Sequence, residues 1–142
     1  MLDHGFPKSI RLLGSRQYRI VYEKGERIRG FHVQLFYVLN GLRFPRFGIS
    51  VGRRLGKAVT RNRLKRRIRE AVRLRKANLP YGVDVVVHPK TSAGRLGSRA
   101  TFLEINRLLD DLTRALGTPQ ERRVKLHLFV QAVYLAASTS GL

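Results

Sequence analysis

The chain has 142 residues, of which 29 are Lys or Arg and 9 are Asp or Glu, so its formal charge at pH 7 is +20. This length and the 43% hydrophobic content suit one domain with a modest core, which excludes a two-domain enzyme and a fully disordered basic tail. Because such an excess of positive charge destabilises a compact chain, the expected partner is a polyanion, either nucleic acid or an anionic membrane surface.

The N-terminal half predicts one helix and two strands. A short helix is expected after Ser15, a suitable N-cap residue, with its end at Gly25. Residues 31–39 alternate, which predicts a strand whose odd-numbered side chains, Phe31 included, face the core. A turn and loop lead to a second strand over residues 47–51.

The C-terminal half predicts two long helices around a third strand. Residues 57–76 have helical spacing, a strand spans residues 83–87, and a last helix begins with Thr101 and Glu104 as a capping box. The order predicts an α+β fold: a two-layer α/β sandwich of three helices on a small, mostly antiparallel sheet. The apolar positions expected in the core of the last helix are Phe102, Ile105, Leu109, Leu112 and Leu116.

Residues 53–76, called the basic segment below, hold twelve Lys or Arg and a single acid, Glu70, and so carry +11 of the +20. A solvated helix face usually mixes charges of both signs, and a membrane-surface helix needs bulky apolar anchors, so phosphate binding is favoured over both alternatives. At about 100° per residue, one group of polar side chains covers an arc that is roughly 100° wide. This arc lies largely on another side of the helix than the apolar stripe. This group comprises Asn62, Lys65, Arg66, Arg69, Arg73 and Lys76.

No catalytic or metal site is predicted in the protein. The chain has no Cys, its nine acids are scattered, and its four His lie in different segments. Residues 52–58 differ from a phosphate-binding loop in glycine spacing, and Ala58 stands where that loop needs Ser or Thr. His32 and His88 are expected on the same side of a sheet, in ordinary polar or stacking roles.

Phe36 is the candidate for a stacking contact with a single-stranded ligand. It lies on the polar register of its strand, and the next strand has a small face that includes Gly48 and Ser50. A flat aromatic ring beside open backbone is typical of single-strand binding. The alternative is that the first helix covers Phe36, with Tyr18 packed on it; both interpretations hold if the two rings line a groove.

The sequence Gly-Lys-Ala-Val-Thr-Arg-Asn-Arg-Leu-Lys-Arg-Arg-Ile-Arg-Glu, residues 56–70, closely resembles the signature of the bacterial ribonuclease P protein subunit. The resemblance runs from Phe6-Pro7-Lys8 to near Leu116 and includes Phe47-Gly48-Ile49-Ser50-Val51. It implies a left-handed βαβ crossover and removal of the 5′ leader from precursor tRNA, with catalysis by the RNA subunit and its magnesium. On this basis residues 1–117 form the RNA-binding domain, and residues 118–142 are an extension of unknown role, expected as a short helix packed on the body.

The resemblance implies two RNA contacts for the protein. The single-stranded leader would lie in a cleft lined by Tyr18, Phe36, Gly48 and Ser50. The partners are then the catalytic RNA subunit and precursor tRNA, with Mg²⁺ bound through the RNA and no protein ligands for it. Further cations of the basic segment are included in the set of residues that we expect to contact the RNA subunit. This set comprises Arg53, Arg54, Lys57, Arg61, Asn62, Arg63, Lys65, Arg66, Arg69 and Arg73.

Two other functions remain open on sequence grounds: a ribosomal protein or general RNA chaperone, and a cationic membrane-active protein. The mostly apolar run 126–137 is shorter than the roughly 20 residues of a membrane span, and residues 1–10 lack the apolar stretch of a secretory signal. We therefore expect a cytoplasmic protein without a membrane partner or an obligate protein partner.

Overall fold

The computed structural model describes residues 8–75, 82–117 and 119–140. Its short 3-10 helices are η1 (Lys8–Ile10), η2 (Arg53–Leu55) and η4 (Thr91–Arg95). Its strands are β1 (Glu26–Arg29), β2 (Val33–Leu39), β3 (Arg46–Ile49) and β4 (Val83–Pro89). Its α-helices are α1 (Gly14–Lys24), α2 (Ala58–Arg75), α3 (Ser98–Leu116) and α4 (Pro119–Ser140). The predicted α+β class is confirmed; the end of the helix expected over 57–76 lies outside the described residues.

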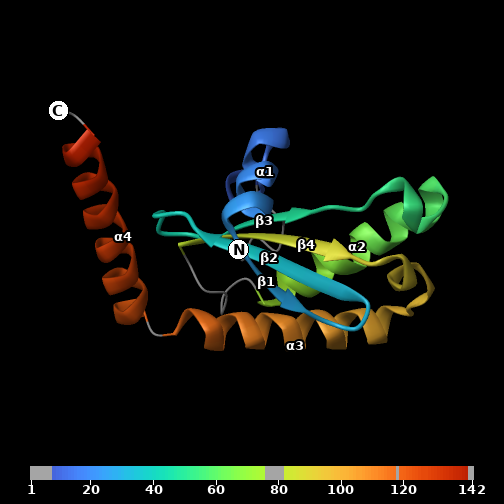
Figure 1. The fold of residues 1–142 in the computed structure, drawn as a ribbon. Coiled ribbons are helices and arrows are strands. Elements are labelled where there is room, and N and C mark those ends of the chain that lie inside the picture. Colours follow the sequence, from blue (N-terminus) through green and yellow to red (C-terminus); the bar gives the residue numbers. More distant parts are fainter. Residues whose placement is uncertain (1–7, 76–81, 118, 141–142) are drawn as a thin grey trace.

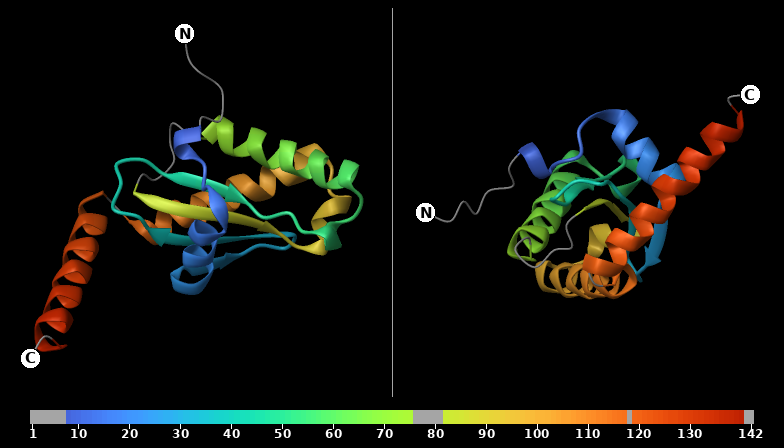
Figure 2. Two further views of the ribbon diagram at one scale, coloured as in Figure 1. Left: turned by 90° about the horizontal axis from the view of Figure 1, so that it is seen from above. Right: turned by 90° about the vertical axis from the view of Figure 1, so that its left-hand side faces the viewer.

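The four strands form one sheet in the order β1-β2-β4-β3. The pairs β1–β2 and β2–β4 are antiparallel, and β3 is parallel to β4. The sheet is therefore mostly antiparallel, as predicted, and the chain passes through α2 to connect its one parallel pair. Helix α1 covers one face of the sheet, whereas α2 and α3 cover the other (Figures 1 and 2).

The main core lies between the sheet and the helices α2 and α3. Leu64, Ile68, Ala71 and Val72 of α2 are all buried, so the predicted apolar stripe of this helix is confirmed. The expected core positions of α3 are also buried with one exception, Phe102, which is 37% exposed. The buried stripe of α3 consists of Thr101, Ile105, Leu108, Leu109, Leu112 and Leu116, and Phe102 points about 100° away from its first member.

Two of the three predicted helix starts are wrong, because the expected capping residues do not cap these helices. Helix α1 begins at Gly14, so Ser15 lies inside it rather than at the N-cap. Helix α3 begins at Ser98, so Thr101 and Glu104 do not form a capping box. The Glu104 carboxylate instead accepts a hydrogen bond from the backbone N–H of His32, at 2.8 Å.

The sheet differs from the prediction at its edges. β1 was not predicted, because it is only four residues long and mostly polar. Its pairing with β2 leaves residues 30–32 as the connecting turn, so Phe31 does not face the core and is 76% exposed. β3 spans Arg46–Ile49 rather than residues 47–51.

The tail forms a helix, α4, but this helix has 22 residues rather than being short, and its expected packing on the body is also wrong. Leu128, Phe129, Val133 and Tyr134 are each more than half exposed, and α4 extends away from the sheet (Figures 1 and 2). Its apolar side chains surround the helix axis rather than forming one stripe, so no single face can dock on the body. Among the described residues, no helix is long and apolar enough to cross a membrane.

Candidate nucleic-acid interface

The basic segment forms η2 and α2 and leaves most of its cations accessible. The buried apolar stripe fixes α2 on the sheet, which turns the remaining side chains outward. Arg61, Lys65 and Arg73 are half-buried. The other residues predicted to contact the RNA subunit are exposed: Arg53, Arg54, Lys57, Asn62, Arg63, Arg66 and Arg69. The predicted set thus lies on two successive elements, η2 and α2, with Lys57 between them.

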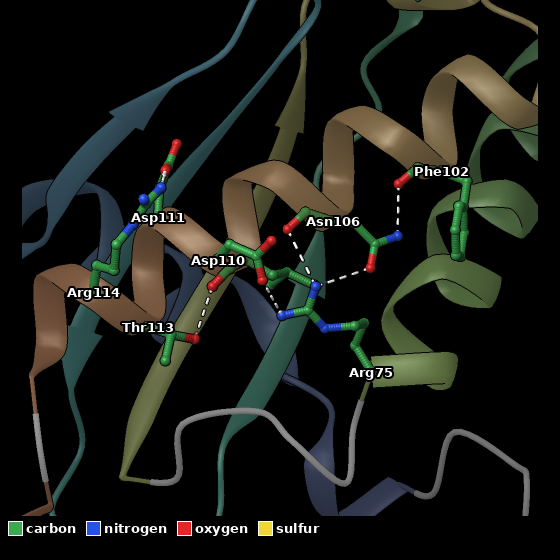
Figure 3. A network of polar contacts seen from close by, with 8 residues as sticks. Arg75, Phe102, Asn106, Asp110, Asp111, Thr113 and Arg114 are labelled. Atoms are coloured by element: carbon green, nitrogen blue, oxygen red, sulfur yellow. Dashed lines mark hydrogen bonds and ion pairs between the residues drawn. The ribbon is translucent and has the colours of Figure 1, made fainter.

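Three arginines of the basic segment make internal contacts. Arg75 donates to the side chain of Asn106 at 2.9 Å and to Asp110 at 2.6 Å, which ties the end of α2 to α3 (Figure 3). Arg67 donates to the backbone carbonyl of Leu96 at 2.5 Å. Arg73 pairs with Glu70, and its hydrogen bonds hold the pKa of that exposed carboxyl below its ordinary value. Within the predicted RNA-binding set, the charge of Arg73 is therefore partly neutralised by Glu70.

The second predicted surface, called the cleft below, is the region where α1 packs on the sheet. Phe36 of β2, Val86 of β4 and Gly48 of β3 lie in one row across its floor. β4 therefore lies between the strands of Phe36 and Gly48, so the prediction that these two strands are neighbours in the sheet is wrong. The ring of Tyr18 lies on Gly48 so closely that an added Cβ at this glycine would be 2.6 Å from Tyr18 Cζ. Glycine is required here because the ring and the strand backbone share this space.

Tyr22, rather than Tyr18, packs on Phe36. Their ring centres are 4.8 Å apart in an edge-on arrangement, one helical turn beyond Tyr18. The alternative that the first helix covers Phe36 is therefore confirmed, with Tyr22 in the place expected for Tyr18; the ring is half-buried, and its role in stacking stays a prediction. Helical spacing places Tyr18 and Tyr22 on the same face of the first helix. The sequence therefore indicates that either ring could contact Phe36 but not which one does.

His88 of β4 is a further cleft residue that the sequence did not single out for the leader site. Its Nδ1 lies 2.8 Å from the hydroxyl of Tyr22. Burial raises the pKa of Tyr22, although a hydrogen bond with Ser50 acts in the opposite direction. The cleft thus joins Tyr22, His88 and Ser50, while His32 lies elsewhere, with its Nδ1 2.8 Å from Ser92 Oγ. The expectation that His32 and His88 share one side of the sheet is wrong, because His32 belongs to the β1–β2 turn.

The stability of the protein is expected to decrease as the pH falls below about 6.5, the ordinary His pKa. Burial lowers the pKa of His88 in the folded chain, so the unfolded chain binds this proton more readily and acid favours unfolding. Urea unfolding between about pH 8 and pH 5 measures the effect. His88→Gln should reduce the pH dependence, whereas His127→Gln, at an exposed histidine of α4, should leave it intact. The same dependence in His88→Gln as in the parent protein would contradict this assignment.

The floor of the cleft ends at a buried ion pair. Arg46 donates from Nε to Asp84 Oδ1 at 2.8 Å and from a terminal nitrogen to Oδ2 at 2.7 Å. Asn40 adds a third hydrogen bond to Asp84, at 2.8 Å. Asp84 is thus engaged in holding β3, β4 and the loop after β2 together. Within the described ranges, no three His, Asp or Glu side chains gather as a metal site would require.

Comparison with known proteins identifies the family. A family model described as Ribonuclease P matches residues 6–113. The chain is 32% identical over 115 residues to the ribonuclease P protein component of Thermotoga sp. strain RQ2, covering 81% of this chain and 98% of that relative. It is also 32% identical to the component of Coxiella burnetii, covering 80% of this chain and 93% of that relative. The chain belongs to the ribonuclease P protein family.

Solved structures agree with this assignment. The RNase P protein of Staphylococcus aureus matches with a TM-score of 0.70 at 25% identity, covering 75% of this chain and 97% of that one. The protein from Thermotoga maritima matches with a TM-score of 0.65 at 31% identity, covering 70% of this chain and 94% of that one. The chain is thus a protein component of ribonuclease P, an RNA-based tRNA-processing endoribonuclease, and the ribosomal-protein alternative is not favoured. The family match ends at residue 113, before α4, and the division predicted at residue 117 stays a prediction.

Proposed function

We propose that this ribonuclease P protein binds the catalytic RNA subunit with its basic segment and holds the single-stranded 5′ leader of precursor tRNA in the cleft under α1. The observation that carries the proposal is the separation of the two surfaces. Helix α2 and helix α1 lie on opposite faces of the sheet (Figure 2). One small domain can therefore contact a large structured RNA and a flexible strand at the same time.

The chemistry of each surface suits its proposed ligand. Exposed guanidinium groups such as those of Arg66 and Arg69 provide charge and paired donors for the phosphates of a folded RNA. Asn62 adds an amide that can bond to sugar hydroxyls or base edges. The cleft instead offers the rings of Tyr18 and Phe36, on which unpaired bases can stack without regard to sequence.

We also propose that magnesium is bound through the RNA subunit. The exposed donors of the basic segment are cations and an amide, which repel a divalent cation or bind it weakly. The one acid of the segment, Glu70, is paired with Arg73. The protein residues would then act by neutralising phosphates and by positioning the substrate, in the cytoplasm where precursor tRNA is processed.

The test of this function is reconstitution with the catalytic RNA. At low magnesium, addition of the purified protein should stimulate cleavage of precursor tRNA at the single 5′ site, because the protein supplies charge that magnesium otherwise provides. A general RNA chaperone or a membrane-active protein would not stimulate single-site cleavage. Absence of stimulation by a correctly folded protein would contradict the proposal.

Phe36→Ala is expected to weaken binding of leader-bearing precursor tRNA by the holoenzyme more than binding of mature tRNA. Loss of one base–aromatic stack reduces the binding free energy by about 1–3 kcal/mol. Mature tRNA lacks the leader and does not make this contact, so its binding should not change. Equilibrium binding of both RNAs to the holoenzyme measures the difference. Phe36→Tyr, which keeps a ring in the cleft, is the matched control. Equal losses for both RNAs would show that Phe36 serves only in packing.

A further inference from the structure

Phe31 and Arg107 form an exposed aromatic–cation pair outside both proposed RNA surfaces. The guanidinium carbon of Arg107, on α3, lies 5.2 Å from the centre of the Phe31 ring, which is 76% exposed. A pocket of about 320 Å³ opens beside them, with Leu96 and Leu103 in its wall. This volume is near the lower end of the roughly 300–1,000 Å³ of small-ligand sites, and it suits a single planar group such as a nucleobase.

The turn that carries Phe31 is held in place by hydrogen bonds on both sides of the ring. The N–H of His32 donates to Glu104 Oε1 at 2.8 Å, and its carbonyl accepts from the backbone N–H of Lys90 at 2.8 Å. The Lys90 ammonium donates to the carbonyl of Gly30 at 2.9 Å. The ring is thus presented to solvent on a fixed backbone, which lowers the entropic cost of binding a ligand to it.

Two arginines of β1 lead from the cleft to this turn. Arg27 pairs with Phe36 and Arg29 pairs with Gln34 in the antiparallel register, so both lie on the cleft face of the sheet. The guanidinium carbon of Arg27 is 5.9 Å from the centre of the Phe36 ring. Arg29 also lines a second pocket, of about 400 Å³, together with Phe31 and Arg107. At about 3.3 Å per residue, the turn lies roughly 13 Å along the strand from Arg27.

The charge around the pocket favours a polyanion. Arg29, Lys90 and Arg107 surround the turn, and one of the two nearby acids, Asp111, pairs with Arg114. The other acid, Glu104, accepts the hydrogen bond from His32 at Oε1, and its buried Oε2 has no partner among the described residues, so three cations face one unpaired carboxylate. A ring flanked by cations matches a stacked base with adjacent phosphates better than it matches a peptide. The arginines of β1 connect the pocket to the cleft. The nucleic acid strand expected in the pocket is therefore the same single-stranded 5′ leader that we propose for the cleft.

We propose that the Phe31 pocket binds a nucleotide of the 5′ leader that lies beyond the cleft, with its base on Phe31 and its phosphates at Arg29 and Arg107. This inference rests on the proposed function of the cleft. A leader long enough to leave the cleft along β1 gains a second stacking contact at the turn, whereas a short leader does not reach it. The protein would therefore favour precursors with longer leaders.

The test uses the holoenzyme and two precursor tRNAs with leaders of about five and about fifteen unpaired nucleotides. Phe31→Ala should weaken binding of the long-leader precursor by about five- to tenfold and leave the short-leader precursor unchanged. Phe31→Leu should behave like Phe31→Ala, whereas Phe31→Tyr should restore binding, because the ring and not apolar bulk is required. Tyr134→Ala, at a tyrosine of α4 that is 73% exposed, is the control and should change neither affinity.

The alternative outcomes separate this inference from the function of the cleft. If Phe36→Ala weakens leader binding and Phe31→Ala does not, the pocket proposal is wrong and the cleft proposal stands. If neither variant distinguishes leader-bearing precursor from mature tRNA, the cleft function itself is wrong. If Phe31→Ala weakens binding of the catalytic RNA alone, or of both precursors equally, the pocket contacts the RNA subunit rather than the leader. Unchanged affinity for every RNA would show that the pocket contacts none of them and would overturn the proposal.

Discussion

Replacement of Lys57, Arg66 and Arg69 together with alanine should weaken binding of the catalytic RNA subunit by roughly a thousandfold or more. All three side chains are exposed, and each charge-assisted contact to a phosphate contributes about 1.5 kcal/mol or more. Each lost phosphate contact also removes about 0.7–0.9 from the slope of log K against log salt, so the slope should become shallower by about two to three. Binding titrations of the RNA subunit at several salt concentrations measure both quantities.

The matched control removes the same charge elsewhere. Arg43, Arg99 and Arg114 are exposed and lie outside the basic segment and the cleft. Their triple alanine variant has the same net charge as the first variant, so a general electrostatic effect would lower both affinities equally. Arg66→Ala alone should reduce the slope by about one. An unchanged slope in the first triple variant would remove these residues from the phosphate contacts.

Arg46→Ala should lower the free energy of unfolding by about 2–3 kcal/mol, because it leaves a buried carboxylate without its cation. The Asp84 side chain is 7% exposed, and Arg46 donates two hydrogen bonds to it, one to each carboxylate oxygen. The hydrogen bonds with Asp84 also raise the pKa of Arg46. Urea denaturation of the purified protein measures the loss.

Two further variants identify the cause of that loss. Arg114→Ala removes an ion pair with Asp111 whose arginine is 74% exposed, and it should cost less than about 1 kcal/mol. The double variant Arg46→Met with Asp84→Val removes both charges and extends the valine run of β4, so it should recover most of the stability. A double variant as unstable as Arg46→Ala would show that the arginine acts by packing rather than by neutralising Asp84.

The sequence predicts a helix in the C-terminal extension, which α4 confirms, but it predicts packing of this helix on the body, which the structure does not show. Local composition favours a helix over residues 119–140, and that expectation needs no tertiary information. Docking needs one apolar face and a complementary surface, and the consecutive, exposed Leu128, Phe129 and Val130 point about 100° apart around the axis. The family match, which ends at residue 113, provides no template for its position.

The amino-acid sequence by itself determined the function class and the basic segment. Charge, the ordered motif of residues 56–70 and the helical period of Leu64, Ile68 and Val72 are local properties that can be read along one chain. They were sufficient to predict an exposed, cationic α2 docked by one face on a sheet, and the structure confirms this arrangement.

Only the tertiary structure decided how the cleft is built. β4 follows α2 in the chain but pairs between β2 and β3, and this pairing places Phe36, Val86 and Gly48 in one row. The angle of α1 then puts Tyr22 on Phe36, and the register of β1 turns Phe31 outward toward Arg107. Such contacts join residues far apart in sequence, and the alternating pattern of one strand decides which of its side chains face the core but not which other strand lies beside it.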